Sequence, residues 1–270
     1  MGIYDRDYQR EPLPRGGFAS MRMLSITTWL IVINVVIFLL DQMLTPRFGS
    51  ELALRLAILR AAEHPGYNPT MSPVAQWGHF SMFWAIGHLQ VWRFLTFQFL
   101  HGSTSHLFGN MLSLYFFGPI VESHFGSRRY LAFYLICGMA GAGSYLILWI
   151  LGILGASPMV PLVGASAGIF GILMAAAWLA PDVEVMLMFP PVSLKLKTMA
   201  WIMMGIAAYT VFAFGHSSRH NAGGEAAHLG GGLLALVFMC IRHSWNPFAP
   251  FRKSRWSPKI QHDWTRDFDR

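Results

Sequence analysis

The sequence contains few charged residues: Asp, Glu, Lys and Arg together make up only 12% of the chain. A soluble globular protein is usually about 25% charged, whereas hydrophobic residues account for 54% of this chain. The shortage of charge excludes an ordinary water-soluble domain. It indicates instead a membrane protein whose chain crosses the bilayer several times.

Cysteine is also scarce, and Cys137 and Cys240 both lie within apolar runs. This excludes a disulfide framework and a zinc site built on cysteine pairs. The H-E-x-x-H pattern of zinc proteases is missing as well. His216 and His220 are four residues apart, but they lie in a polar loop rich in Ser and Gly, so we interpret them as solvated. We therefore expect no metal and no cofactor.

The beginning of the chain lacks the apolar core of a signal peptide, because charged residues and prolines interrupt it. Residues 1–25 are predicted to be a cytoplasmic tail. The net charge of +7 would suit nucleic-acid binding, but the basic residues flank apolar runs, where they orient a protein in a bilayer. We therefore expect the lipid bilayer, and not a nucleic acid, as the partner of these charges.

Six apolar runs are each close to the roughly 17–25 residues that a helix needs to cross the hydrocarbon. The predicted fold is an all-α, polytopic bundle of six transmembrane helices over residues 26–242, followed by a basic cytoplasmic tail at 243–270. Asp41 and Pro46 are expected to close the first run, and Gly138, Gly141 and Gly143 to form a close-packing surface on the third. The predicted spans are 26–40, 105–121, 130–154, 163–180, 198–214 and 226–241.

A long mixed segment, residues 45–91, separates the first two spans. Within it, residues 51–62 alternate leucines and isoleucines with arginines. This pattern is typical of an interfacial helix, and a short lid-like surface helix explains it equally well. Six spans place both termini on one side of the membrane, and most Lys and Arg lie on that side, so both termini are predicted to be cytoplasmic. A bacterial inner membrane fits this arrangement, with an organellar membrane as the alternative.

Polar residues unexpected in lipid lie where the second, fourth and sixth spans begin. The second span opens with His101, His106 and Asn110, the fourth with Ser166 and the sixth with His228. These three spans run in the same direction, so their starts are expected at a similar shallow depth on the external side. Ionisable residues inside a membrane usually face a bundle interior or a wet cavity and mark functional sites.

Ser166 lies in the stretch V-G-A-S-A-G-I-F-G, among residues with almost no side chain. Such a stretch can simply let helices pack closely. Chemically, however, a serine hydroxyl becomes a nucleophile when a base accepts its proton, and His228 is a suitable base. His106 and Asn110 are four residues apart on one helical face, where their side chains could donate hydrogen bonds to an oxyanion.

Residues 164–168 also match G-x-S-x-G, the nucleophile elbow of soluble α/β hydrolases. That elbow requires a strand before the serine and a helix after it. Here the flanking segments are predicted membrane spans, so we reject this interpretation.

Several motifs in order resemble the rhomboid family of intramembrane serine proteases over roughly residues 91–241. They are W-R at 92–93, F-L-H-G-S-T-S-H-L-F-G-N, V-E-S-H-F-G-S, G-A-S-A-G and A-H-L-G-G-G. The resemblance implies that Ser166 is the nucleophile and His228 the general base, in a dyad without an aspartate. It implies that His106 and Asn110, with the backbone N–H of Ser166, form the oxyanion hole.

The same resemblance implies structural roles for Arg93, which follows Trp92, and for Glu122, and it makes residues 45–91 a first loop that dips into the membrane. Gly164 and Phe170 would lie near the site. Phe170 stands where some members have a tyrosine that packs under the histidine, so the stacking face is kept and the hydroxyl is lost. Ala167 stands where many members have glycine. We expect these two departures to tune the rate modestly.

The leading hypothesis is a serine endopeptidase that cleaves single-span or other membrane-protein substrates. The main alternative is a non-proteolytic membrane protein that binds client helices, with Ser166 as a packing residue. A small transporter is a weaker alternative, because it would need charged residues near the middle of the membrane. The sequence specifies neither a natural substrate nor an oligomeric state.

Overall fold

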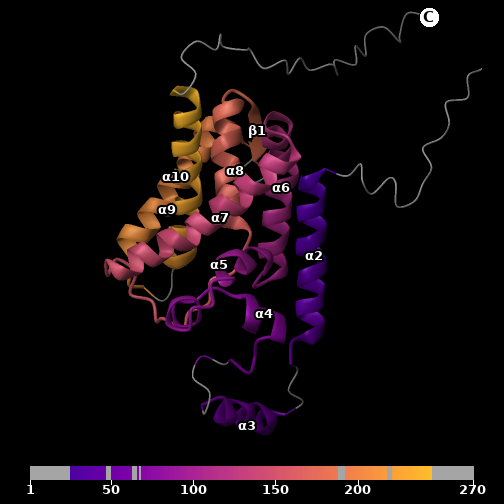
Figure 1. Ribbon diagram of the computed structural model, residues 1–270, viewed down its shortest axis with the longest axis vertical. Helices are drawn as coiled ribbons and strands as arrows, with labels where there is room; N and C mark the ends of the chain where they lie inside the picture. Colours follow the sequence, from indigo (N-terminus) through magenta and orange to yellow (C-terminus); the bar gives the residue numbers. More distant parts are fainter. Residues whose placement is uncertain are drawn as a thin grey trace, which may run out of the picture.

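The computed structural model describes residues 25–46, 50–62, 66, 68–187, 192–217 and 221–244, so the predicted tails lie almost entirely outside the described residues. Helices form a bundle whose long members lie roughly side by side, as predicted (Figure 1). They are α2 (Ile26–Leu44), α6 (Thr104–Phe125), α7 (Ser127–Ile150), α8 (Ser166–Leu179), α9 (Leu196–Phe214) and α10 (Ala222–Ser244).

Each of the six predicted spans coincides with one of these helices. Four of them, α2, α7, α9 and α10, are long and apolar enough to cross a membrane. Helix α8 is apolar but has only 14 residues, and α6 carries many polar residues along its 22 positions. The helical membrane bundle is thus confirmed, whereas the count of six spans stays a prediction.

The first helix does not close at Asp41, contrary to that part of the prediction, but it does end just before Pro46, at Leu44. Helix α2 continues to Leu44, and the Asp41 side chain is buried within it. The hydroxyl of Ser72, 31 residues away, donates a hydrogen bond to its carboxylate. A buried carboxylate is tolerated where a donor satisfies it, so this residue attaches the first loop to α2 and does not end the helix.

The segment between α2 and α6, which includes the first loop, contains short helices: α3 (Glu51–Ala62), α4 (Pro73–Gly78), the π-helix η1 (Met82–Gly87), α5 (Arg93–Thr96) and the 3₁₀ turn η2 (Phe97–Phe99). Helix α3 lies apart from the bundle (Figure 1). It exposes Leu52, Leu56 and Leu59, apolar side chains of the kind that a membrane interface covers. This favours the interfacial interpretation of residues 51–62 over the lid.

Arg93 forms hydrogen bonds that join separate parts of the segment between α3 and α6. Its guanidinium donates to the carbonyl oxygens of His79 at 2.6 Å and Gln76 at 3.0 Å, and to Oε1 of Gln90 at 2.7 Å. Burial lowers the pKa of Arg93 to about 10, so the group stays a cation at neutral pH. Neighbouring Trp92 stacks on Trp77, with ring centroids 5.0 Å apart.

Glu122, near the end of α6, holds the start of α2. Its carboxylate accepts hydrogen bonds from the backbone N–H groups of Ile26 at 2.8 Å and Thr27 at 3.0 Å, and from the Thr27 hydroxyl at 2.8 Å. The Ser127 hydroxyl donates to it at 2.8 Å. The first N–H groups of a helix have no partner within the helix, so Glu122 satisfies two of them and fixes α2 against α6 and α7.

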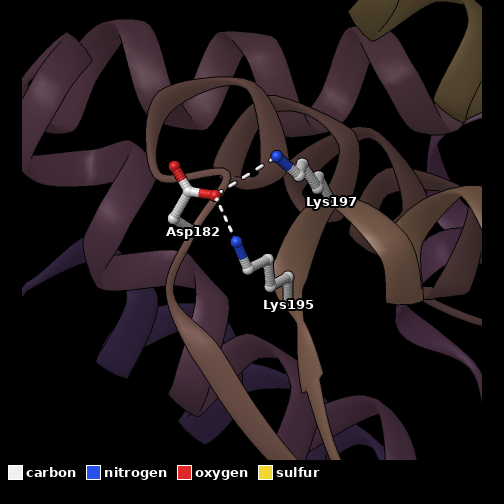
Figure 2. Close-up of polar contacts among 3 residues, drawn as sticks. All are labelled: Asp182, Lys195 and Lys197. Carbon is white, nitrogen blue, oxygen red and sulfur yellow. Dashed lines mark hydrogen bonds and ion pairs between the residues drawn. The ribbon is translucent and has the colours of Figure 1, made fainter.

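A short antiparallel hairpin between α8 and α9 was not predicted. Strand β1 (Glu184–Leu187) pairs with β2 (Val192–Lys195). Just before it, the Asp182 carboxylate accepts hydrogen bonds from Lys195 and Lys197, each at 3.2 Å (Figure 2). The hydrogen bonds from Lys197 and Lys195 lower the pKa of Asp182. All three groups face water, so these ion pairs add little stability.

Helices α7, α8 and α10 pack at very short range, with α8 buried throughout from Ala167 to Ala177. A Cβ at Gly231 of α10 would lie 2.0 Å from the Ala167 carbonyl oxygen, and one at Gly141 of α7 would lie 2.5 Å from the Ala167 Cβ. Small residues allow this approach. Gly143 was predicted to share the surface, but it has open space around it.

The pair Gly141 and Gly143 gives a matched test of this packing. Gly141→Ala is expected to destabilise the protein by about 1–3 kcal/mol, because its methyl group overpacks the α7–α8 contact. Gly143→Ala is expected to be neutral or to stabilise the helix by up to about 1 kcal/mol. Unfolding in detergent measures both. Equal stability of the two variants would contradict the packing argument.

Candidate active site

The starts of α6, α8 and α10 lie at the end of the bundle that faces α4 and α5 (Figure 1). Helix α2 begins and helix α10 ends at the opposite end of the bundle (Figure 1). This matches the predicted common direction of the three helices. Near these starts the sequence has His106 and Asn110 in α6, Ser166 in α8 and His228 in α10.

All four of these side chains line one cavity of about 540 Å³. Gly164 and Phe170, both predicted to lie near the site, line it too. Its other walls are mostly apolar, with contributions from Phe97, Phe117, Pro161, Leu162, Val163, Ile169, Leu173 and Met203. An apolar cavity with a few convergent polar groups is typical of a binding or active site.

Ser166 is the first residue of α8, and a glycine with a positive φ lies two residues before it. Gly164 has a φ of +134°, a backbone conformation that glycine adopts far more readily than other residues. Its N–H donates to the Phe97 carbonyl at 3.0 Å. A Cβ at this position would lie 2.8 Å from Cε1 of His106. Glycine therefore lets the loop before Ser166 pass directly against the His106 ring.

The N-terminus of α8 also has no side-chain cap. The first hydrogen bond of the helix runs from the Ile169 N–H to the Ala165 carbonyl at 3.1 Å. The N–H groups of Ser166, Ala167 and Gly168 precede it. Uncapped N–H groups at a helix start favour bound negative charge, so the backbone beside the Ser166 hydroxyl suits an oxyanion.

His228 is held on two sides. Its ring stacks on Phe170, as predicted, with centroids 4.1 Å apart and planes 7° from parallel. Its Nδ1 lies 2.9 Å from the Oε2 atom of Glu225, one turn earlier in α10. Within the described part of the chain, no hydrogen bond joins this ring to the Ser166 hydroxyl. Such bonds often form only when substrate is bound.

The Asn110 side chain is held by His101, a residue whose supporting role was not predicted from the sequence. Its buried amide donates to Nε2 of His101 at 3.0 Å. His101 lies in the loop before α6, and burial lowers its pKa to about 3, so the ring is neutral and can accept this bond. An asparagine amide has two N–H donors, and the second is left for another acceptor in the cavity.

The remaining predicted residues lie outside the cavity walls. Trp92 and Arg93 secure the first loop, and Glu122 secures α2. Of the two loop histidines, His216 is exposed and His220 lies outside the described residues. Across the described ranges, no three His, Cys, Asp or Glu side chains gather as metal ligands would. Glu225 was missed, although its position three residues before His228 places it on the same helical face.

Comparison with known proteins identifies related chains. Residues 88–245 match the family described as the Rhomboid domain. The chain is 30% identical over 140 residues to Rhomboid protein 1, mitochondrial, of Saccharomyces cerevisiae, covering 52% of this chain and 38% of that protein. It is 38% identical over 89 residues to Rhomboid protease GluP of Bacillus subtilis, covering 33% of this chain and 16% of that protein.

A third relative differs in its stated activity. Inactive RHOMBOID-like protein 8 of Arabidopsis thaliana is 26% identical over 163 residues, which cover 56% of this chain and 44% of that protein. The matched region thus makes up less than half the length of each of these three relatives.

Proposed function

This chain belongs to the rhomboid family, and on that premise we propose that it is an active intramembrane serine endopeptidase. The observation that carries the proposal is the single cavity lined by Ser166, His228, His106 and Asn110. Those four side chains come from three helices, yet they converge at one end of the bundle. A packing serine would need neither a histidine nor hydrogen-bond donors around it.

In the proposed acylation step, Oγ of Ser166 attacks the carbonyl carbon of the scissile peptide bond, and Nε2 of His228 accepts the hydroxyl proton. The side chains of His106 and Asn110 and the N–H of Ser166 donate to the resulting oxyanion. The tetrahedral intermediate collapses with loss of the amine, which takes the proton from His228. Water then attacks the acyl group, with His228 as base, and releases Ser166.

The proposed substrates are membrane proteins with a single or otherwise accessible span. A regular helix hides its peptide bonds, because their N–H and C=O groups are already paired inside the membrane. A substrate segment must therefore unwind to reach Ser166. The helices that carry the proposed site begin near one end of the bundle (Figure 1), where we expect water to supply the second step. We place this end outside a bacterial inner membrane, with both termini in the cytoplasm.

The alternative is a family member that binds client helices without cutting them. One relative carries the word inactive in its name, so family membership alone does not decide between the two. The residues that line the cavity do bear on the choice between a protease and a binder. This chain retains both the serine and the histidine in one cavity, whereas a binder has no need of either.

A fluorophosphonate probe separates the two functions. With the purified protein in detergent, we expect covalent labelling at Ser166, located by mass spectrometry of the peptides. A transmembrane substrate should be cleaved by the same preparation and should slow the labelling by competition. A protein that stays unlabelled and cleaves nothing, while remaining folded, would contradict the protease and favour the binder.

A further inference from the structure

Glu225 places a carboxylate beside His228. The family resemblance describes this site as a dyad of Ser166 and His228 alone. The Oε2 atom of Glu225 lies 2.9 Å from Nδ1 of His228. Both side chains are largely sheltered, with 24% of Glu225 and 15% of His228 exposed. They lie one turn apart at the start of α10, so the helix itself maintains the contact.

This contact determines which ring nitrogen carries the proton. An ionised carboxylate can only accept a hydrogen bond, so Nδ1 of His228 must be the donor. In a neutral imidazole the other nitrogen, Nε2, then has the free lone pair. That is the nitrogen that a general base needs, because Nδ1 is occupied and faces Glu225.

Two contacts together fix the ring. Stacking on Phe170, at 4.1 Å and 7°, sets the plane of the imidazole. Stacking alone permits a 180° flip about the Cβ–Cγ bond, which keeps the ring plane but moves Nδ1 to the opposite edge, and the bond from Nδ1 to Glu225 selects one of these two orientations. With both contacts in place the ring has one orientation, and His228 lines the same cavity as Ser166.

We propose that Glu225 is a positioning residue for the base, so that this protein works with a Glu–His–Ser series and not with a bare dyad. The inference rests on the proposed function. Glu225 holds the Nδ1-protonated tautomer in the resting state. When His228 accepts the Ser166 proton through Nε2 and becomes a cation, the carboxylate stabilises that charge.

A purely structural role is the competing explanation. Glu225 lies in the first turn of α10, where a negative charge stabilises any helix. Such a role would lower stability in a variant and leave turnover per folded molecule unchanged. The positioning role predicts the reverse, a loss in kcat with substrate binding unchanged.

The kinetic test compares Glu225→Gln and Glu225→Ala with the wild type on a transmembrane substrate. Gln keeps an acceptor for Nδ1–H but loses the charge, and Ala loses both. We expect kcat to fall in the order wild type, Gln, Ala, by about ten- to a hundredfold for Ala, with KM nearly unchanged. This is below the loss seen in fully buried triads, because Glu225 is partly exposed. An Ala variant with the kcat of the wild type would overturn the inference.

Glu51→Gln is the matched control. It removes the same charge from the first turn of α3, where Glu51 is 71% exposed and bonds only Arg55 among the described residues. Its kcat should equal that of the wild type. If Glu51→Gln lowered kcat as much as Glu225→Gln does, the loss would be a general effect of charge and the inference would fall.

Nitrogen-15 NMR of the histidine rings supplies a readout that needs no turnover. We expect Nδ1 of His228 to be protonated in the wild type, with the Nε2-protonated form gaining in Glu225→Ala; His228→Ala assigns the signals. A wild-type ring protonated at Nε2 would overturn the inference even in an active protein. A protein that cleaves nothing would overturn the proposed function separately, whatever its tautomer.

Discussion

Ser166→Ala is expected to reduce cleavage of a transmembrane substrate by about four to six orders of magnitude, to a rate at or near background. The substitution removes the oxygen that the proposed mechanism acylates, while Ala at the first position of α8 keeps the helix and the cavity wall. Binding should survive, since the apolar walls are untouched. The measurement is single-turnover cleavage beside fluorophosphonate labelling, and both should vanish together.

Ser113→Ala is the matched control for this variant. Ser113 lines the same cavity, but its hydroxyl donates to the Gly109 carbonyl at 2.9 Å within α6. It is therefore an ordinary helix serine, and its removal should leave cleavage and labelling close to wild type. If Ser166→Ala cleaved substrate as fast as Ser113→Ala does, the covalent mechanism would be wrong.

Much of the fold could be predicted because apolar runs in a membrane protein have few other structures open to them. The exact ends of the helices could not be predicted, because they depend on contacts with residues that are distant in the sequence. Asp41 looks like a helix terminator until Ser72 is seen to satisfy it. The hairpin of β1 and β2 escaped prediction for another reason: strands of four residues are too short to show a period of two.

Some features of the candidate site could likewise be predicted from the sequence, and others could not. His106 and Asn110 could be paired from their spacing on one helix, and the meeting of three helix starts followed from counting spans. The hydrogen bond between Asn110 and His101 could not be predicted from the sequence, since it depends on the path of the loop before α6. The contact between Glu225 and His228 could have been predicted, because the two residues are three positions apart on one helix. It was missed because a family described by a dyad gives no reason to look for a third member.

His228→Ala should be nearly as damaging as Ser166→Ala, with a loss of about four orders of magnitude or more. Without the imidazole, the proposed base is lost and the hydroxyl returns to its weak native reactivity. Fluorophosphonate labelling should fall with cleavage, because the probe needs the same activated oxygen. His216→Ala is the control, since it removes an exposed histidine from the loop after α9 and should cleave normally.

The double variant tests whether the two residues act as one unit. If the hydroxyl is useful only when the ring accepts its proton, removing the second partner after the first should change the residual rate little. Additive losses would mean that His228 contributes through something other than Ser166, such as the shape of the cavity beside Phe170. Non-additivity would instead show that the two residues act together, as expected if a proton passes between Ser166 of α8 and His228 of α10. The close packing at Gly231, where a Cβ would lie 2.0 Å from the Ala167 carbonyl oxygen, brings these two helices together beside the cavity that both residues line.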